Sequence, residues 1–252
     1  MSNESLRVIQ LTDLHLDSPA KPLHHREGTT EDTLRHVLDH VRKEPKDLVL
    51  CTGDLVDRPS ATAYAKLREL LASLDCPLHC LPGNHDDPPL ARSLLSGPAF
   101  HWEPLFERGG WRFVLLNTWV AGEVRGSLSP NELELLATGL ASDLDSPTLV
   151  ALHHHPLPTG SAWMDSLMLT NPHELFAIVQ RHPQVRAMLW GHIHQAFDLE
   201  QQGIRFLGSP STCMQFEPRA PRFAVAELPP GYRRIVLHPD GSVDTEVVYC
   251  AV

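Results

Sequence analysis

Residues 78–86 read Leu-His-Cys-Leu-Pro-Gly-Asn-His-Asp, a short apolar run followed by a glycine turn and three polar side chains. Five other apolar runs of similar length lie at 6–11, 48–51, 111–116, 148–152 and 186–190. All but the third of these are also followed closely by aspartate or histidine. The runs are continuous rather than alternating, which is typical of strands covered on both faces. They therefore predict the inner strands of an α/β fold.

Helices are predicted between these runs. Apolar stripes at helical spacing mark 29–44 and 60–74. Two further helices are expected to begin at Ser129-Pro130 and at Asn171-Pro172, where a capping residue precedes proline and glutamate follows in the first turn. Strands and helices thus alternate as in an α/β protein.

After Gly203 the pattern changes to strands without helices. These strands are predicted at 204–207, 223–228, 234–237 and 243–249. We expect this part, 203–252, to form an antiparallel edge or a second sheet. No linker or repeat interrupts the chain, so we interpret 1–252 as a single domain whose core motifs lie at 8–194.

Composition excludes several classes of protein. No apolar stretch approaches the roughly 18 residues that span a bilayer, so no membrane association is expected. The formal charge of -10 opposes binding of a nucleic-acid polymer, and the densest basic stretch, 219–234, holds four arginines and no lysine. Five irregularly spaced cysteines, and a start at 1–6 that is neither basic nor apolar, predict a reduced cytoplasmic protein.

The polar residues after the strands are metal-ligand types. Because ligands bind at the carboxyl ends of the strands in α/β sheets, five segments far apart in sequence are expected to meet at one rim. Carboxylates, imidazoles and an amide oxygen suit manganese, iron, zinc or cobalt, and seven such ligands are too many for one ion. Two ions that share a carboxylate fit this number. Glycine before Asp54, Asn84 and His192 allows a sharp turn at each strand end.

The five blocks read Asp-x-His, Gly-Asp, Gly-Asn-His-Asp, His and Gly-His-x-His, and in this order they resemble the calcineurin-like metallophosphoesterases. The resemblance implies a four-layer αββα sandwich with a dinuclear metal site at the carboxyl-terminal rim of the strands. It assigns one metal to Asp13, His15 and His194, the other to Asn84, His154 and His192, and the bridging position to Asp54.

The fourth block is the least defined, because His153, His154 and His155 are consecutive. The family's ligand lies two residues before a proline, which selects His154. Side chains alternate along a strand, so His153 and His155 are expected to point to the opposite face.

A narrower resemblance is to the bacterial class III 3',5'-cyclic-AMP phosphodiesterases. It rests on the segments 153–160, 163–165, 191–195 and 210–216, which we expect to shape a nucleotide pocket or subunit contacts. The resemblance implies hydrolysis of cyclic AMP to 5'-AMP by a hydroxide that bridges two metals, with iron or manganese expected and zinc or cobalt acceptable. The alternative is another small phosphodiester, such as a glycerophosphodiester or a 2',3'-cyclic nucleotide. A non-catalytic scaffold is disfavoured because no ligand is missing.

Catalysis of this reaction requires a proton for the ribose oxygen that leaves. His85 follows the ligand Asn84 and is predicted to donate it, with Asp86 orienting the ring. The expected partner is therefore a small cyclic nucleotide. The sequence leaves the oligomeric state open, and a homodimer is compatible with it. The residues predicted to bind this substrate are His15, Asp54, Asn84, His85 and His194.

Overall fold

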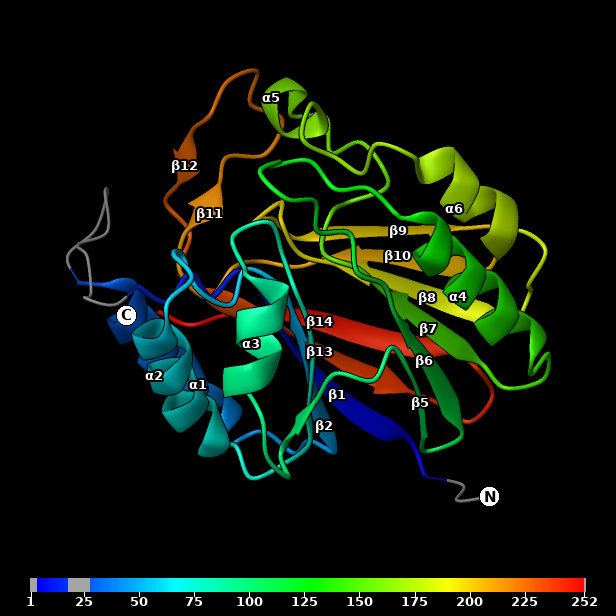
Figure 1. The fold of residues 1–252 in the computed structure, drawn as a ribbon, viewed down its shortest axis with the longest axis horizontal. Helices are drawn as coiled ribbons and strands as arrows, with labels where there is room; N and C mark the ends of the chain where they lie inside the picture. The colour runs from blue at the N-terminus through cyan, green and yellow to red at the C-terminus, as the bar shows by residue number, and fades with distance from the viewer. Residues whose placement is uncertain (1–3, 18–27, 252) are drawn as a thin grey trace.

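The computed structural model describes residues 4–17 and 28–251. Two six-stranded sheets face each other at the centre of the molecule (Figure 1). The first sheet runs in the order β14 (Val243–Tyr249), β13 (Gly231–Leu237), β1 (Leu6–Leu11), β2 (Leu48–Thr52), β3 (Leu78–Leu81) and β4 (Phe100–His101). The second runs β5 (Leu105–Arg108), β6 (Trp111–Leu115), β7 (Thr148–Ala151), β8 (Val185–Trp190), β10 (Ile204–Gly208) and β9 (Phe197–Gln201).

Helices cover the outer face of each sheet. Three pack on the first sheet: α1 (Thr30–Val41), α2 (Ala61–Ala72) and α3 (Pro88–Leu94). Two pack on the second: α4 (Pro130–Ala141) and α6 (Pro172–Val179). A third apolar cluster, which includes Val8, Leu50, Phe113 and Leu189, fills the space between the sheets. The predicted αββα sandwich is therefore confirmed.

The six predicted inner strands are β1, β2, β3, β6, β7 and β8, and each has a neighbour on both sides. Within each sheet these strands are parallel, so their carboxyl ends meet at one rim. In the strand-rich tail, β13 and β14 form an antiparallel edge of the first sheet, as expected. By contrast, β10 joins the second sheet in parallel to β8.

Two helix starts that look alike in sequence differ in the structure. Ser129 caps α4 by accepting a hydrogen bond from the Glu132 amide. Asn171 is the N-cap residue of α6, as expected, but its side chain makes no capping bond to the helix. Its amide instead bonds both backbone groups of Leu128, at 3.0 Å each, and so ties α6 to the segment before α4.

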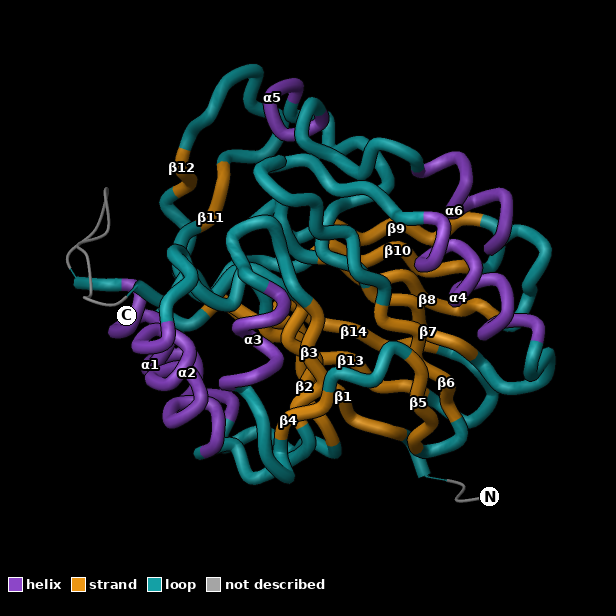
Figure 2. The backbone as a smooth tube through the Cα atoms, viewed as in Figure 1, coloured by secondary structure: helices purple, strands orange, loops and turns teal. Residues whose placement is uncertain are grey.

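The remaining elements gather at one end of the molecule. The short helix α5 (Ala162–Asp165) and the two-stranded sheet of β11 (Gln215–Phe216) and β12 (Val225–Ala226) lie together there, away from the longer helices (Figure 2). Among the residues described, no helix is both long and apolar enough to cross a bilayer.

Candidate metal centre

The backbone at the strand ends is locally strained. Five of the predicted metal ligands have a left-handed conformation, with φ of 52° at Asp13, 43° at His15, 49° at Asp54, 66° at His192 and 46° at His194. Residues other than glycine rarely adopt this region, and each instance costs about 1–3 kcal/mol that surrounding structure must hold in place. Such strain often marks a functional site.

The three glycines in these turns are required by space. A Cβ atom on Gly83 would collide with the backbone and carboxylate of Asp54, and one on Gly191 would collide with Thr12 and Asp13. A Cβ on Gly53 would collide with the His153 ring and the Gly83 backbone nitrogen, and its φ of +94° also favours glycine. The three turns therefore bring the strand ends closer together than larger residues would allow.

Asp13, His15 and His194 form a first cluster. His194 Nε2 lies 3.3 Å from Asp13 Oδ1 and 3.2 Å from His15 Nε2. The other nitrogen of His194 donates to the Met214 carbonyl oxygen at 2.8 Å, which fixes the ring and leaves Nε2 as the lone-pair atom. The predicted first set of ligands is thus brought together.

Asp54 lies between this cluster and a second one. Its Oδ2 atom is 3.5 Å from His15 Nε2 and 3.4 Å from His153 Nε2, while Oδ1 accepts the His85 backbone N–H at 2.9 Å. Burial alone would raise the pKa of Asp54, but the neighbouring imidazoles of His153 and His15 outweigh it and hold this pKa well below its ordinary value. An ionised carboxylate in this position can contact both clusters.

The second cluster contains His153, contrary to expectation. His153 Nε2 lies 3.2 Å from Asn84 Oδ1, and its Nδ1 donates to the Thr52 carbonyl oxygen at 2.8 Å. The prediction that His153 points to the opposite face is wrong, since β7 ends at Ala151 and the alternation of a strand no longer governs the residues that follow.

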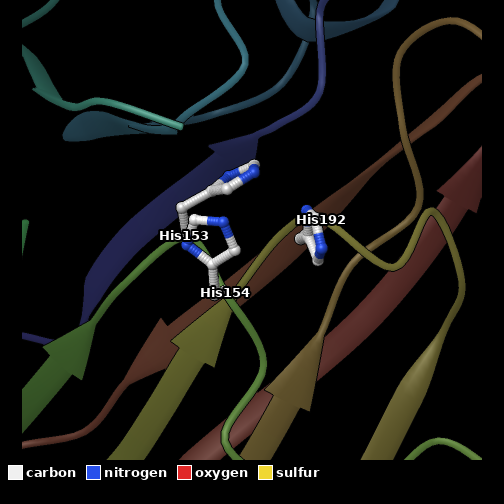
Figure 3. A group of neighbouring side chains, drawn as sticks. All are labelled: His153, His154 and His192. Carbon is white, nitrogen blue, oxygen red and sulfur yellow. The ribbon is translucent and has the colours of Figure 1, made fainter. Parts of the chain in front are cut away.

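His154 is oriented differently, and its ring is nearly perpendicular to that of His153, at 88° (Figure 3). Its Nδ1 lies 2.7 Å from the Thr118 hydroxyl and its Nε2 lies 3.0 Å from the Val124 carbonyl oxygen. The Val124 oxygen can only accept, so Nε2 donates and Nδ1 accepts from Thr118. Both nitrogens of His154 are thereby used, although a ligand atom of this ring lies within 4.8 Å of those of His153 and His192.

The ring nitrogens of His192 show whether the two clusters fit metal ions. Its backbone N–H donates to Asp13, and among the described residues its buried Nε2 has no hydrogen-bond partner. Burial and the nearby imidazoles lower the pKa of His192 well below its ordinary value, so the ring is neutral, the form that binds metals. A buried nitrogen without a partner is costly in a protein but suits a ligand atom. The residues therefore fit a pair of metal ions.

The prediction that Asp86 orients His85 is also wrong. The buried Asp86 carboxylate accepts hydrogen bonds from the backbone of Gly83 at 2.9 Å and Leu55 at 3.1 Å, and from the Tyr64 hydroxyl at 3.0 Å. Burial, reinforced by the charge of Asp54, raises the pKa of Asp86 to about 6. Asp86 is committed to bracing the two turns that follow β2 and β3.

Asp57 holds the His85 ring instead. His85 Nδ1 lies 3.0 Å from the Asp57 carbonyl oxygen and 3.6 Å from a carboxylate oxygen of the same residue. The same carboxylate oxygen is 3.6 Å from His15 Nδ1. Sequence reasoning missed Asp57, because it lies outside the five blocks and an aspartate in a turn carries no distinctive signal.

A cavity of about 690 Å³ opens onto the centre. The five residues predicted to bind substrate all line it: His15, Asp54, Asn84, His85 and His194. Apolar side chains line it as well, among them Trp163 and Met214 from two of the four segments expected to shape a pocket. The volume lies within the range of small-molecule sites.

The sequence matches the family model described as calcineurin-like phosphoesterase over residues 6–196. The chain belongs to this family. Residues 13–194, which carry all seven predicted ligands, fall inside the match.

Named relatives are similar to this chain over nearly its whole length, beyond the residues that the family model matches. The chain is 39% identical over 251 residues to the 3',5'-cyclic adenosine monophosphate phosphodiesterase CpdA of Pseudomonas aeruginosa, covering 98% of this chain and 90% of that protein. It is 40% identical over 249 residues to the 3',5'-cyclic-nucleotide phosphodiesterase alr5338 of a Nostoc species, covering 97% and 93%. A dimetal phosphatase from Danio rerio has the same fold, with a TM-score of 0.62 at 16% identity, covering 98% and 99%.

Proposed function

We propose that this chain hydrolyses 3',5'-cyclic AMP to 5'-AMP. The observation that carries the proposal is the position of Asp54 between two groups of metal-ligand residues, at the floor of a cavity large enough for a nucleotide. Relatives that align over nearly the whole chain are named for this substrate class. This similarity favours a cyclic nucleotide over other small phosphodiesters.

The metal ligands are part of the proposal. Asp13, His15 and His194 would hold one ion and Asn84, His153 and His192 the other, with Asp54 placed to contribute to both. His153 takes the place that the family pattern assigns to His154, because its Nε2 faces Asp54 and Asn84. Carboxylate and imidazole ligands suit iron and manganese, and also zinc and cobalt. When bound, two such ions neutralise phosphate charge and lower the pKa of water so that hydroxide is available at neutral pH.

The side chains that line the cavity complete the reaction. Asn84 contacts a phosphate oxygen through its amide nitrogen, and His85 donates a proton to the ribose oxygen that leaves. The His85 Nδ1–H is held by the Asp57 carbonyl, which leaves Nε2 as the atom that exchanges this proton. Asp57 is a positioning residue, because it acts through the His85 ring.

Two further properties belong to the same proposal. The net charge of -10 favours a small substrate over a nucleic-acid polymer, which the surface would repel. All five cysteines are free in the structure, which agrees with a reducing compartment, and we place the enzyme in the cytoplasm.

A substrate panel tests the proposal. Protein loaded separately with manganese, iron, zinc or cobalt is assayed against cyclic AMP, 2',3'-cyclic AMP, a glycerophosphodiester and a phosphomonoester, with products identified by chromatography. We expect the highest kcat/KM on cyclic AMP, with 5'-AMP as the product. An Asp54→Ala protein purified in parallel controls for contaminating enzymes. A preparation that hydrolyses only the glycerophosphodiester or 2',3'-cyclic AMP would refute the assignment.

A further inference from the structure

Three aromatic rings form one wall of the cavity, and we call Trp163, Phe216 and Phe223 the aromatic wall. Trp163 lies in α5, Phe216 in β11 and Phe223 in the segment before β12. Each pair of rings is in contact, with centroids 5.1–5.4 Å apart and planes inclined by 67–77°. This edge-to-face packing fixes the three rings relative to one another.

The aromatic wall begins beside the metal centre. The ring of Phe216 stacks on that of His194, with centroids 4.1 Å apart and planes inclined by only 9°. His194 in turn lies 3.3 Å from Asp13. A molecule whose phosphate contacts the metal-ligand residues can therefore reach the wall with a group one sugar away.

The aromatic wall presents apolar surface that the described residues leave uncovered. Phe223 is 58% exposed although it is a large aromatic side chain, and it lines the cavity. Met164, Leu167 and Val225 extend the same apolar lining. A compact phosphodiester would leave this surface in contact with water, whereas a flat heterocycle would cover it.

We propose that the aromatic wall is the base subsite of the enzyme and binds the purine of a cyclic nucleotide through its face. The inference rests on the proposed function and adds the part of the substrate that the metal centre does not recognise. Stacking of a base on an aromatic side chain strengthens binding by about tenfold or more. A purine covers more of the wall than a pyrimidine does, so purine nucleotides are preferred.

The test compares ligands that differ only in the base. Calorimetry of the metal-loaded protein measures the dissociation constants of 5'-AMP and ribose 5-phosphate. In the wild-type protein we expect 5'-AMP to bind at least about tenfold more tightly, as the stacking of one base predicts. Phe223→Ala should abolish most of this difference, whereas Phe223→Tyr should keep it.

A matched control distinguishes loss of the Phe223 ring from loss of an exposed apolar side chain elsewhere in the protein. Leu144 is 63% exposed and follows α4, outside the cavity lining, so Leu144→Ala should bind both ligands as the wild type does. Steady-state assays add a second readout: Phe223→Ala should raise KM for cyclic AMP about tenfold with little change in kcat.

The outcomes distinguish the two proposals. If the wild type turns over cyclic AMP but Phe223→Ala keeps both the wild-type KM and the preference for 5'-AMP, the base subsite is overturned and the proposed function stands. If cyclic AMP is not hydrolysed while 5'-AMP is still favoured over ribose 5-phosphate through Phe223, the proposed function fails and the base subsite survives. Equal binding of 5'-AMP and ribose 5-phosphate by the wild type also overturns the subsite.

Discussion

His85 Nδ1 lies 3.0 Å from the backbone carbonyl oxygen of Asp57, so the turn after β2 orients a ring that follows β3. The contact joins two segments of the same rim and occupies Nδ1, so the ring can exchange a proton only at Nε2. A backbone carbonyl can hold the ring only while the turn itself is ordered. Here Asp86 provides that order, since its carboxylate accepts backbone N–H groups from both turns.

Replacement of His85 tests its role as the acid. His85→Ala should retain both metals but lose roughly 10² to 10⁴ in kcat on cyclic AMP, because the ribose oxygen leaves poorly without a proton. On bis-p-nitrophenyl phosphate the loss should be much smaller, since p-nitrophenolate is a stable leaving group. Steady-state kinetics on both esters, with metal content measured, checks this. Equal losses on both esters would mean that His85 binds phosphate or packs the turn.

Replacement of Asp86 should affect stability rather than proton transfer. Asp86→Asn places an amide NH₂ among backbone and hydroxyl donors, and we expect the free energy of unfolding to fall by about 1–3 kcal/mol. Denaturant titration measures this fall, with the exposed Asp145→Asn as the control. Activity on cyclic AMP and on bis-p-nitrophenyl phosphate should decline together. A selective loss on cyclic AMP at unchanged stability would restore Asp86 as the partner of His85.

Two neighbouring histidines offer a matched pair of variants for the metal ligands. Both His153 and His154 are fully buried, so replacement by alanine creates a cavity in each case. His153→Ala should bind close to one ion per chain, because the nitrogen that faces Asp54 is removed. His154→Ala should still bind two. Elemental analysis after equilibration with excess metal decides the question, and the reverse result would restore His154 as the ligand.

Loss of the bridging carboxylate should weaken both sites at once. Asp54→Ala removes the group that contacts His15 on one side and His153 on the other, so we expect the affinity for each ion to fall. Asp57→Ala removes a nearby carboxylate that does not lie between the clusters and should retain both ions. Metal titration followed by calorimetry gives the two affinities. An Asp54→Ala protein that binds both ions normally would exclude a bridge.

The sequence was sufficient to predict most of the fold. The inner strands are continuous apolar runs, and runs of this length that alternate with helical stripes are typical of buried parallel strands. Weaker elements were not predicted: β4 has two residues, and α3 begins with two prolines that obscure its helical pattern. Asn171 precedes α6 as expected, but local sequence cannot show that its amide bonds the distant Leu128 rather than the helix.

At one strand end the sequence left the choice of ligand open. Among three consecutive histidines the choice depends on where β7 ends, a boundary that hydrophobic pattern places only to within a few residues. The roles of Asp57 and Phe223 were not predicted, for another reason. Their roles come from contacts across the rim, between chain segments whose proximity exists only in the folded protein.

The left-handed backbone at the strand ends has a consequence for stability. Glycine at His192 would relieve strain of about 1–3 kcal/mol, a sizeable part of the roughly 5–15 kcal/mol that stabilises a typical domain. The same replacement would destroy a metal site. The strained backbone and the metal-ligand side chain therefore belong together, and the surrounding structure must offset the strain for as long as the chemistry is kept.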